Sequence, residues 1–92
     1  MKNLIFALYD KKAHAYTTPF YLQTKEMAVR EFSNMANNKD TQVGLNPEDW
    51  NLFYMGEYDQ QKGMFELVEP YSLGNALEYK TQMEMFNEVV KT

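Results

Sequence analysis

The sequence predicts an α+β domain, an antiparallel sheet of about four strands with one packed helix and a C-terminal helix. Residues 2–10 and 50–69 predict strands, because apolar and aromatic residues alternate there and turn residues bound each run. An apolar stripe at helical spacing within residues 24–38 predicts the packed helix. With 92 residues, 45% apolar and 24% charged, the chain is expected to form a single domain over residues 1–92.

The first predicted strand has apolar residues at both odd and even positions from Leu4 to Tyr9, which is typical of a central strand covered on both faces. Residues 10–12 form a polar turn. An extended segment over residues 13–23 follows, rich in Tyr, Thr and Phe. Because Pro19 cannot donate a ladder hydrogen bond, it marks an edge, a bulge or a break between two short strands.

Thr24 is the expected N-cap of the packed helix, because its hydroxyl can accept a hydrogen bond from an early backbone N–H. The apolar stripe consists of Ala28, Val29, Phe32, Met35 and Ala36. We expect Asn37 and Asn38 to end the helix, since Asn tolerates the left-handed conformation common at helix ends. Residues 39–49 are interpreted as a loop, because they contain Gly, Asn and Pro.

Residues 50–69 predict a hairpin whose turn, Asp59 to Gly63, uses the positive φ that glycine tolerates. Simple alternation in the first strand places Leu52, Tyr54, Gly56 and Tyr58 on one face and Phe53, Met55 and Glu57 on the other. Gly56 is expected to leave a gap between two tyrosines that admits a base or a neighbouring helix. We expect the second strand to stop at Pro70.

The last helix is expected to be capped by Ser72. Its apolar stripe consists of Ala76, Tyr79, Met83, Phe86 and Val90. The chain has seven methionines, which we interpret as adaptable filler of the core or of an interface.

Several function classes are excluded by composition. Without Cys there is no disulfide, thiolate metal site or cysteine nucleophile, and a reducing compartment is favoured. No nucleophile elbow or phosphate-binding glycine loop occurs, and His14 and the pair Glu48-Asp49 are interpreted as surface residues, so we expect no enzyme activity, metal or cofactor. The longest apolar run, residues 4–9, falls short of the roughly 20 residues that span a bilayer, so no membrane association is expected.

Charge is distributed unevenly along this chain of net charge −4. Residues 1–46 contain six basic and four acidic residues, whereas residues 47–92 contain three basic and nine acidic ones. This asymmetry permits a basic surface on an acidic protein.

Aromatic residues interleaved with cations indicate binding of single-stranded nucleic acid, in which bases stack on aromatic rings and basic groups follow the backbone. The candidate stacking residues are Tyr9, Tyr16, Tyr21, Tyr54 and Tyr58. The candidate phosphate partners are Lys11, Lys12, Arg30 and Lys62. The competing interpretation is that these tyrosines are ordinary core or strand-surface residues, since strands favour Tyr.

Four landmarks stand in a characteristic order: LYDKKA at residues 8–13, PFYLQT at 19–24, AVREF at 28–32 and PEDWNLFYMGEYD at 47–59. This arrangement resembles the small nonstructural protein of gokushoviruses and related Microviridae, phages with circular single-stranded DNA genomes, from about residue 1 to Lys80. The resemblance implies a non-capsid protein made in the host bacterial cytoplasm. It also implies a role described loosely as DNA binding, or as a part in single-stranded DNA synthesis and packaging.

Two functional hypotheses follow. The leading one is a homodimer that binds single-stranded DNA without sequence specificity and supports viral DNA synthesis or packaging. The alternative is a protein–protein adaptor, whose aromatic hairpin and Met-rich helices dock onto a phage or host replication or assembly protein. In that case the acidic second half supplies electrostatic complementarity.

Overall fold

The computed structural model describes residues 2–80. Five strands form one antiparallel sheet in the order β2-β1-β4-β5, and β3 also pairs with β1. The elements are β1 (Lys2–Asp10), β2 (Ala15–Tyr16), β3 (Phe20–Leu22), α1 (Lys25–Ala36), α2 (Gln42–Leu45), the 3-10 helix η1 (Pro47–Asp49), β4 (Trp50–Asp59) and β5 (Met64–Asn75), and residues 76–80 are helical. The predicted α+β class is confirmed. Of the predicted last stripe, Met83, Phe86 and Val90 lie outside the described residues.

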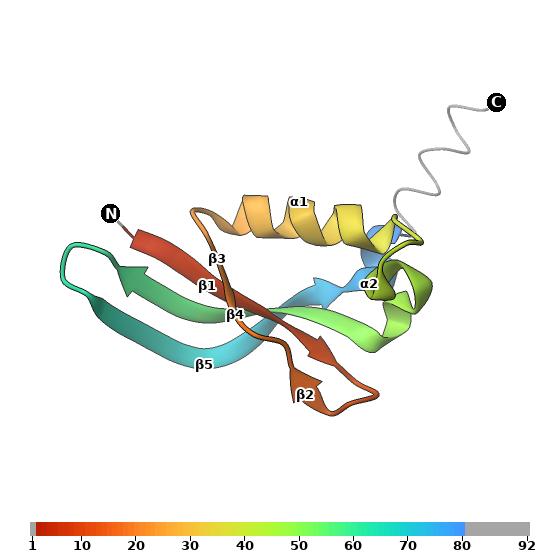
Figure 1. The fold of residues 1–92 in the computed structure, drawn as a ribbon, viewed down its shortest axis with the longest axis horizontal. Coiled ribbons are helices and arrows are strands. Elements are labelled where there is room, and N and C mark those ends of the chain that lie inside the picture. The colour runs from red at the N-terminus through yellow and green to blue at the C-terminus, as the bar shows by residue number, and fades with distance from the viewer. Residues whose placement is uncertain (1, 81–92) are drawn as a thin grey trace.

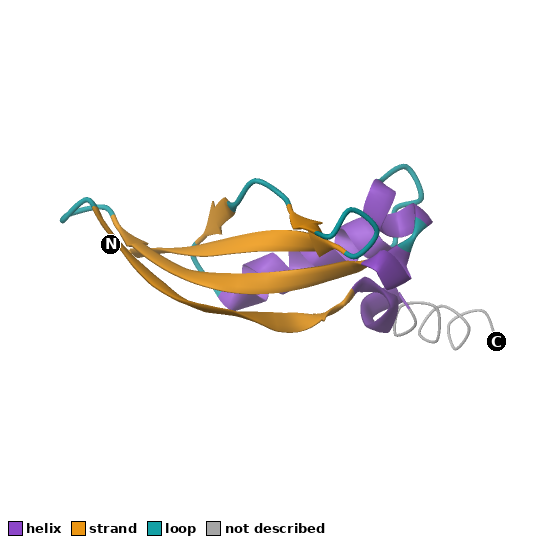
Figure 2. Cartoon of the chain, turned by 90° about the horizontal axis from the view of Figure 1, so that it is seen from below, coloured by secondary structure: helices purple, strands orange, loops and turns teal. Residues whose placement is uncertain are grey.

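The sheet has two unlike faces, because α1 lies across one side of it (Figure 1) and no helix within residues 2–80 lies over the other side (Figure 2). We call the side packed against α1 the covered face; it carries Phe6 and Leu52. We call the opposite side the free face; it carries Ile5 and Tyr58.

β1 is the central strand, paired with β2 and β3 along one edge and with β4 along the other. Its residues Ile5 to Leu8 are all buried, so its side chains are shielded from solvent on both sides of the sheet, as the sequence predicted. The predicted break at Pro19 is confirmed, since β2 ends at Tyr16 and β3 begins at Phe20. Thr17 links the two short strands to β1 by accepting from the Leu8 N–H at 3.0 Å.

α1 begins where its cap predicts, because Thr24 Oγ1 accepts a hydrogen bond from the Met27 N–H at 3.1 Å. Its stripe packs on the covered face, with Ala28, Phe32 and Ala36 buried. Burial of a side chain as large as Phe32 contributes roughly 1.5–3 kcal/mol. The helix ends at Ala36, but its C-cap has φ −100°, so the expected left-handed ending is wrong.

Two further expectations are corrected by the structure. Residues 39–49 are not a plain loop, because Thr41 Oγ1 accepts from the Gly44 N–H at 3.0 Å and caps the short helix α2. β5 does not stop at Pro70 but runs to Asn75, so the last helix begins at Ala76 rather than after a Ser72 cap. Asn75 Oδ1 accepts the Leu77 N–H at 2.9 Å instead.

β5 tolerates Pro70 because it is an edge strand with a bulge at that point. Gly56 pairs with Leu67 and Tyr54 pairs with Tyr71, so residues 68–70 all lie opposite Met55. Proline is accepted at edges and bulges, where its missing N–H is not needed by a neighbouring strand.

A second irregularity, in the pairing of β1 with β4, reverses the alternation of β4, because Met55 is an extra residue between two paired positions. Tyr54 pairs with Phe6 on the covered face, whereas Gly56 pairs with Ile5 and Tyr58 with Asn3 on the free face. The predicted common face of Tyr54, Gly56 and Tyr58 is therefore wrong, because one extra residue in a strand moves the following side chains to the other side. The gap expected at Gly56 is also absent, since a Cβ built there would lie 2.3 Å from the Glu66 carbonyl oxygen of β5.

Candidate nucleic-acid interface

The free face carries two groups of aromatic rings. The Tyr16 cluster, at the β2 end of the face, consists of Tyr9, Tyr16 and Phe53. Its ring centroids are 4.8 Å apart for Tyr9–Tyr16 and 5.3 Å apart for Tyr16–Phe53. The rings come from β1, β2 and β4, so only the assembled sheet brings them together.

The Tyr58 cluster lies toward the β4–β5 turn and consists of Tyr21, Tyr58 and Phe65. The Tyr58 and Phe65 centroids are 4.7 Å apart, and those of Tyr21 and Tyr58 are 6.4 Å apart. Its members come from β3, β4 and β5.

Two adjoining pockets hollow the free face, and Tyr21 and Phe65 line both of them. Each has a volume of about 390 Å³, which is near the lower end of the usual range for ligand pockets. One is lined by Asn3, Tyr21, Tyr58, Gln60, Gly63 and Phe65. The other is lined by Ile5, Pro19, Tyr21, Met55, Phe65 and Leu67.

Much of this apolar surface is accessible to solvent. The exposed fraction is 46% for Tyr16, 45% for Tyr21, 55% for Phe65 and 70% for Leu67. Contiguous exposed apolar surface on a small protein marks a contact site for a ligand or partner.

Acidic side chains on the paired strands lie on the other side of the sheet. Glu57 pairs with Leu4 and with Glu66, and it forms an ion pair with Lys2 at 3.3 Å, which places these groups on the covered side. Asp10 follows Leu8 at even spacing and lies on the same side.

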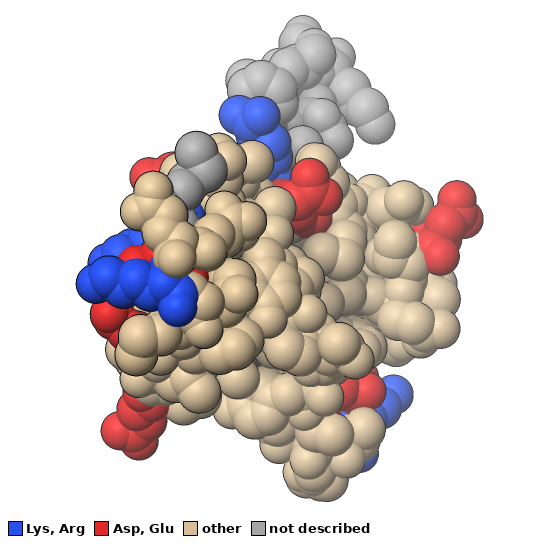
Figure 3. Space-filling view, turned by 60° about the vertical axis from the view of Figure 1, so that its left-hand side comes forward, with Lys and Arg blue, Asp and Glu red and all other residues tan. Residues whose placement is uncertain are grey.

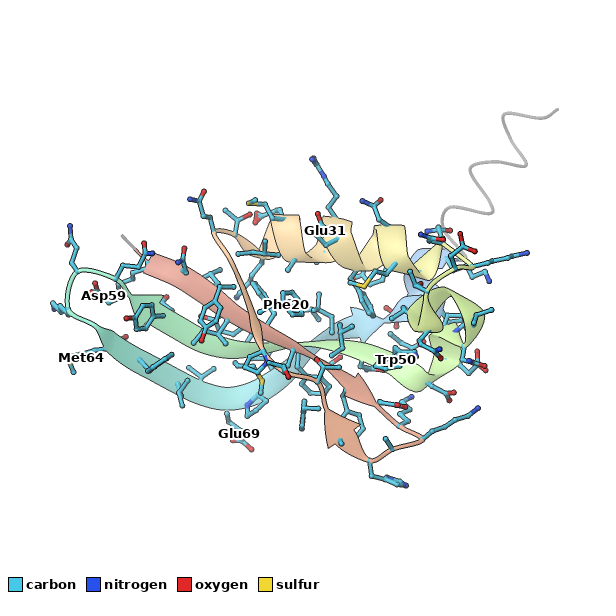
Figure 4. The ribbon with its side chains drawn as sticks, viewed as in Figure 1. Phe20, Glu31, Trp50, Asp59, Met64 and Glu69 are labelled. Carbon is cyan, nitrogen blue, oxygen red and sulfur yellow. The ribbon has the colours of Figure 1, made fainter. Side chains whose placement is uncertain are left out.

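Glu69, in the β5 bulge, is the exception: Figure 4 shows it below β5, on the side away from α1. Figure 3, seen from the β4–β5 turn end, shows charged side chains at the margins and an uncharged middle.

The basic candidates fall into two sets. Lys11 and Lys12 lie in the turn between Tyr9 and Tyr16, next to the Tyr16 cluster, although Lys12 Nζ also pairs with Asp49 at 3.5 Å. Lys62 lies in the β4–β5 turn, next to the Tyr58 cluster.

Arg30 is exposed on α1 and so belongs to the layer on the covered face. It does not join the aromatic surface.

Tyr54 also does not join this surface, because it is buried on the covered face at 9% exposure. Its ring lies 5.8 Å from that of Phe6, and Lys25 Nζ lies 4.6 Å from its centroid while donating a hydrogen bond to the Tyr71 hydroxyl. Burial raises the pKa of the Tyr54 phenol. Tyr54 is therefore a core residue with a cation over its ring.

Phe53 and Phe65 complete the two clusters but were absent from the predicted set. Phe65 could have been found from the hairpin, because strand pairing across a turn sets it beside Tyr58. Phe53 required the location of the bulge, which no local pattern reveals.

Residues 2–80 contain no group of three or more His, Cys, Asp or Glu side chains that could hold a metal ion. His14 is not in a strand but in the β1–β2 turn, with φ 54°. No helix in the described part of the chain is long and apolar enough to cross a membrane.

Comparison with known proteins supports the resemblance seen in the sequence. The family model of the phage ORF5 protein matches residues 3–79. Protein ORF5 of Chlamydia phage 1 is 33% identical over 73 residues, which is 75% of this chain and 76% of the relative. No solved structure matches the chain. The chain therefore belongs to the phage ORF5 protein family, the small phage proteins of gokushovirus type.

Proposed function

We propose that this protein binds single-stranded DNA without sequence specificity in the host bacterial cytoplasm, and that it thereby supports viral DNA synthesis or packaging. The observation that carries the proposal is the free face, where two aromatic clusters lie on one sheet surface between two lysine-bearing turns. Each base stacked on an aromatic ring contributes roughly 1–3 kcal/mol, whatever its identity. No enzymatic step is part of the proposal.

The net charge of −4 is compatible with this function because of where the acids lie. Glu57 and Glu66 are on the covered side, so their carboxylates point away from the DNA that we propose lies on the free face. Lys11 and Lys12 at one end of the free face, and Lys62 at the other, supply the phosphate contacts.

The stacking part of the proposal is tested with a fluorescent oligothymidylate. Tyr16→Ala is expected to weaken binding by roughly 5- to 150-fold, the equivalent of one lost stacking contact. Tyr71→Ala is the matched control, because Tyr71 is 43% exposed but lies on the covered face. Absence of binding at low salt, or equal losses in the two variants, would reject the free face as the site.

The electrostatic part is tested by the salt dependence of the same titration. Replacement of Lys11 and Lys12 by Glu is expected to weaken binding and to reduce the slope of log affinity against log salt by about 1.4, because each phosphate contact on a single strand contributes about 0.7. Replacement of Arg30 and Lys39 by Glu makes the same change in net charge away from the free face. Equal slopes in both double variants would remove the lysine turn from the site, and circular dichroism checks that each variant folds.

A second candidate, binding of another protein chain, is favoured by the exposed edge of β5. The exposed large apolar residues on this strand are Met64, Phe65, Leu67, Val68 and Tyr71. An unpaired strand edge with apolar side chains is suited to pairing with another strand, in a homodimer or with a phage or host protein. Sedimentation equilibrium tests the homodimer: self-association that Leu67→Lys abolishes supports it, and a monomer at all concentrations contradicts it.

A further inference from the structure

We infer that the pocket beside the β4–β5 turn holds one unstacked adenine of the bound strand, whose edge is recognised by the carboxamides of Asn3 and Gln60. The inference rests on the proposed function and adds to it a base preference at one position. The pocket has a volume of about 390 Å³ and opens on the free face.

The walls of this pocket are set by strand register. Asn3 pairs with Tyr58, and Tyr58 pairs with Phe65, so these three residues form one row across β1, β4 and β5. The Tyr58 and Phe65 rings are 4.7 Å apart and inclined by 44°, and Tyr21 closes the row at 71° to Tyr58. Inclined aromatic walls leave ring faces available, so a flat heteroaromatic ligand can stack here.

Two side-chain carboxamides, those of Asn3 and Gln60, line the pocket together with the hydroxyl-bearing rings of Tyr21 and Tyr58. Each carboxamide carries an acceptor oxygen and a donor nitrogen, and within residues 2–80 neither the Asn3 nor the Gln60 side chain hydrogen-bonds to another residue. Carboxamides recognise adenine by donating to N7 and accepting from the N6 amino group. The adjoining pocket lacks such groups, because Ile5, Pro19, Met55 and Leu67 line it, and it therefore suits stacking without base recognition.

The turn that carries Gln60 is held in place by Asp59. The Asp59 Oδ1 atom accepts from the Gln61 N–H at 3.0 Å and from the Lys62 N–H at 3.2 Å. These bonds fix the start of the turn, so Gln60 is presented to the pocket by an ordered backbone. Lys62, in the same turn, is exposed and available to the phosphate of the held nucleotide.

The inference is tested by binding of short homo-oligonucleotides to the full chain. Wild-type protein is expected to bind oligodeoxyadenylate at least about fivefold more tightly than oligothymidylate, at the lower bound for a carboxamide–base pair. Replacing Asn3 and Gln60 by Ala should bring this ratio close to one and leave oligothymidylate affinity within about twofold. Replacement of Asn34 and Gln61 by Ala is the matched control, because neither residue lines the pocket.

Side-chain amide resonances of the wild-type protein provide a second measurement that needs no variant. The NH₂ signals of Asn3 and Gln60 are expected to shift with oligodeoxyadenylate and to stay in place with oligothymidylate.

The outcomes separate the two proposals. If no oligonucleotide binds, the proposed function falls and this inference with it. If the homopolymers bind equally well and the double variant changes nothing, DNA binding stands and the adenine pocket is overturned. If the same amide signals shift with protein concentration alone, the pocket belongs to a contact between chains, which also overturns the inference.

Discussion

Gly56 of β4 lies against the backbone of β5, and its replacement by Ala tests this close packing next to the bulge at Met55. A Cβ at this position would lie 2.3 Å from the Glu66 carbonyl oxygen and 2.8 Å from the Leu67 Cα. Both are backbone atoms, so β5 must move to make room. The residue also has φ +139°, in a region that is unfavourable for residues with a side chain.

The expected magnitude combines two terms. The backbone conformation costs about 1–3 kcal/mol for a residue other than glycine, and forcing an extra methyl group into a packed site costs about 1–3 kcal/mol. Gly56→Ala should therefore lower the free energy of unfolding by about 2–6 kcal/mol, a large part of the roughly 5–15 kcal/mol typical of a domain.

Gly63→Ala is the matched control. Gly63 also has a positive φ, +65°, but a Cβ there would meet no atom within 4 Å. Its replacement should cost only the left-handed conformation, about 1–2 kcal/mol.

Urea unfolding compares the two glycine variants, with the fluorescence of Trp50, the single tryptophan, as the probe. Equal losses of stability in both variants would refute the close approach of β5 to Gly56.

Three further predictions concern the core, the turn and a buried phenol. Phe32→Ala removes a side chain that is 0% exposed; it should cost about 3–5 kcal/mol in urea unfolding, and a loss below about 1 kcal/mol would contradict the core assignment. Hydrogen bonds from the backbone N–H groups of Lys62 and Gln61 lower the pKa of Asp59, so its charge stabilises the fold above the unfolded pKa of about 3.9 and stops doing so as pH falls through the lower folded pKa. The stability difference between wild type and Asp59→Asn should accordingly be constant from neutral pH to about pH 4 and shrink below it; a difference that does not change with pH would contradict this. Burial raises the pKa values of Tyr54 and Tyr79, so a tyrosinate absorbance titration should contain a late component above about pH 10. Tyr54→Phe should shrink this late component and leave the earlier part of the curve in place. Loss of absorbance from the earlier part instead would place Tyr54 in solvent.

Most paired acidic side chains lie on the opposite side of the sheet from the aromatic clusters, which allows an acidic protein to bind DNA there. Alternation along β1, β4 and β5 directs the paired carboxylates to the covered side, where Lys2 already neutralises Glu57. Substitution on the free face can therefore change ligand binding without disturbing this ion pair.

Local physics determined much of this fold from the sequence alone. The double apolar alternation of residues 2–10 marked the central strand, and the hydroxyl of Thr24 marked the first residue of α1. The positive φ of Gly63 closed the predicted hairpin turn. Each of these signals acts over a few neighbouring residues, so it can be recognised without knowledge of the partner strands.

Tertiary structure alone decided where β5 ends. Pro70 is a stop signal in isolation, but at the outer edge of a sheet and inside a bulge its missing N–H is not required. The strand therefore continues to Asn75, and the last helix begins at Ala76, later than the predicted Ser72 cap implies.

The candidate site was likewise determined partly by the sequence and partly by the assembled sheet. The sequence identified Tyr16, Tyr21 and Tyr58 by residue type, and the sheet gathers them on the free face together with phenylalanines from β4 and β5. Tyr54 belongs to the same strand as Tyr58 but lies in the core, because the bulge at Met55 reverses the alternation between them. A bulge is a mismatch in residue count between two paired strands. No single strand carries that information, and only the assembled sheet decided which aromatic rings face outward.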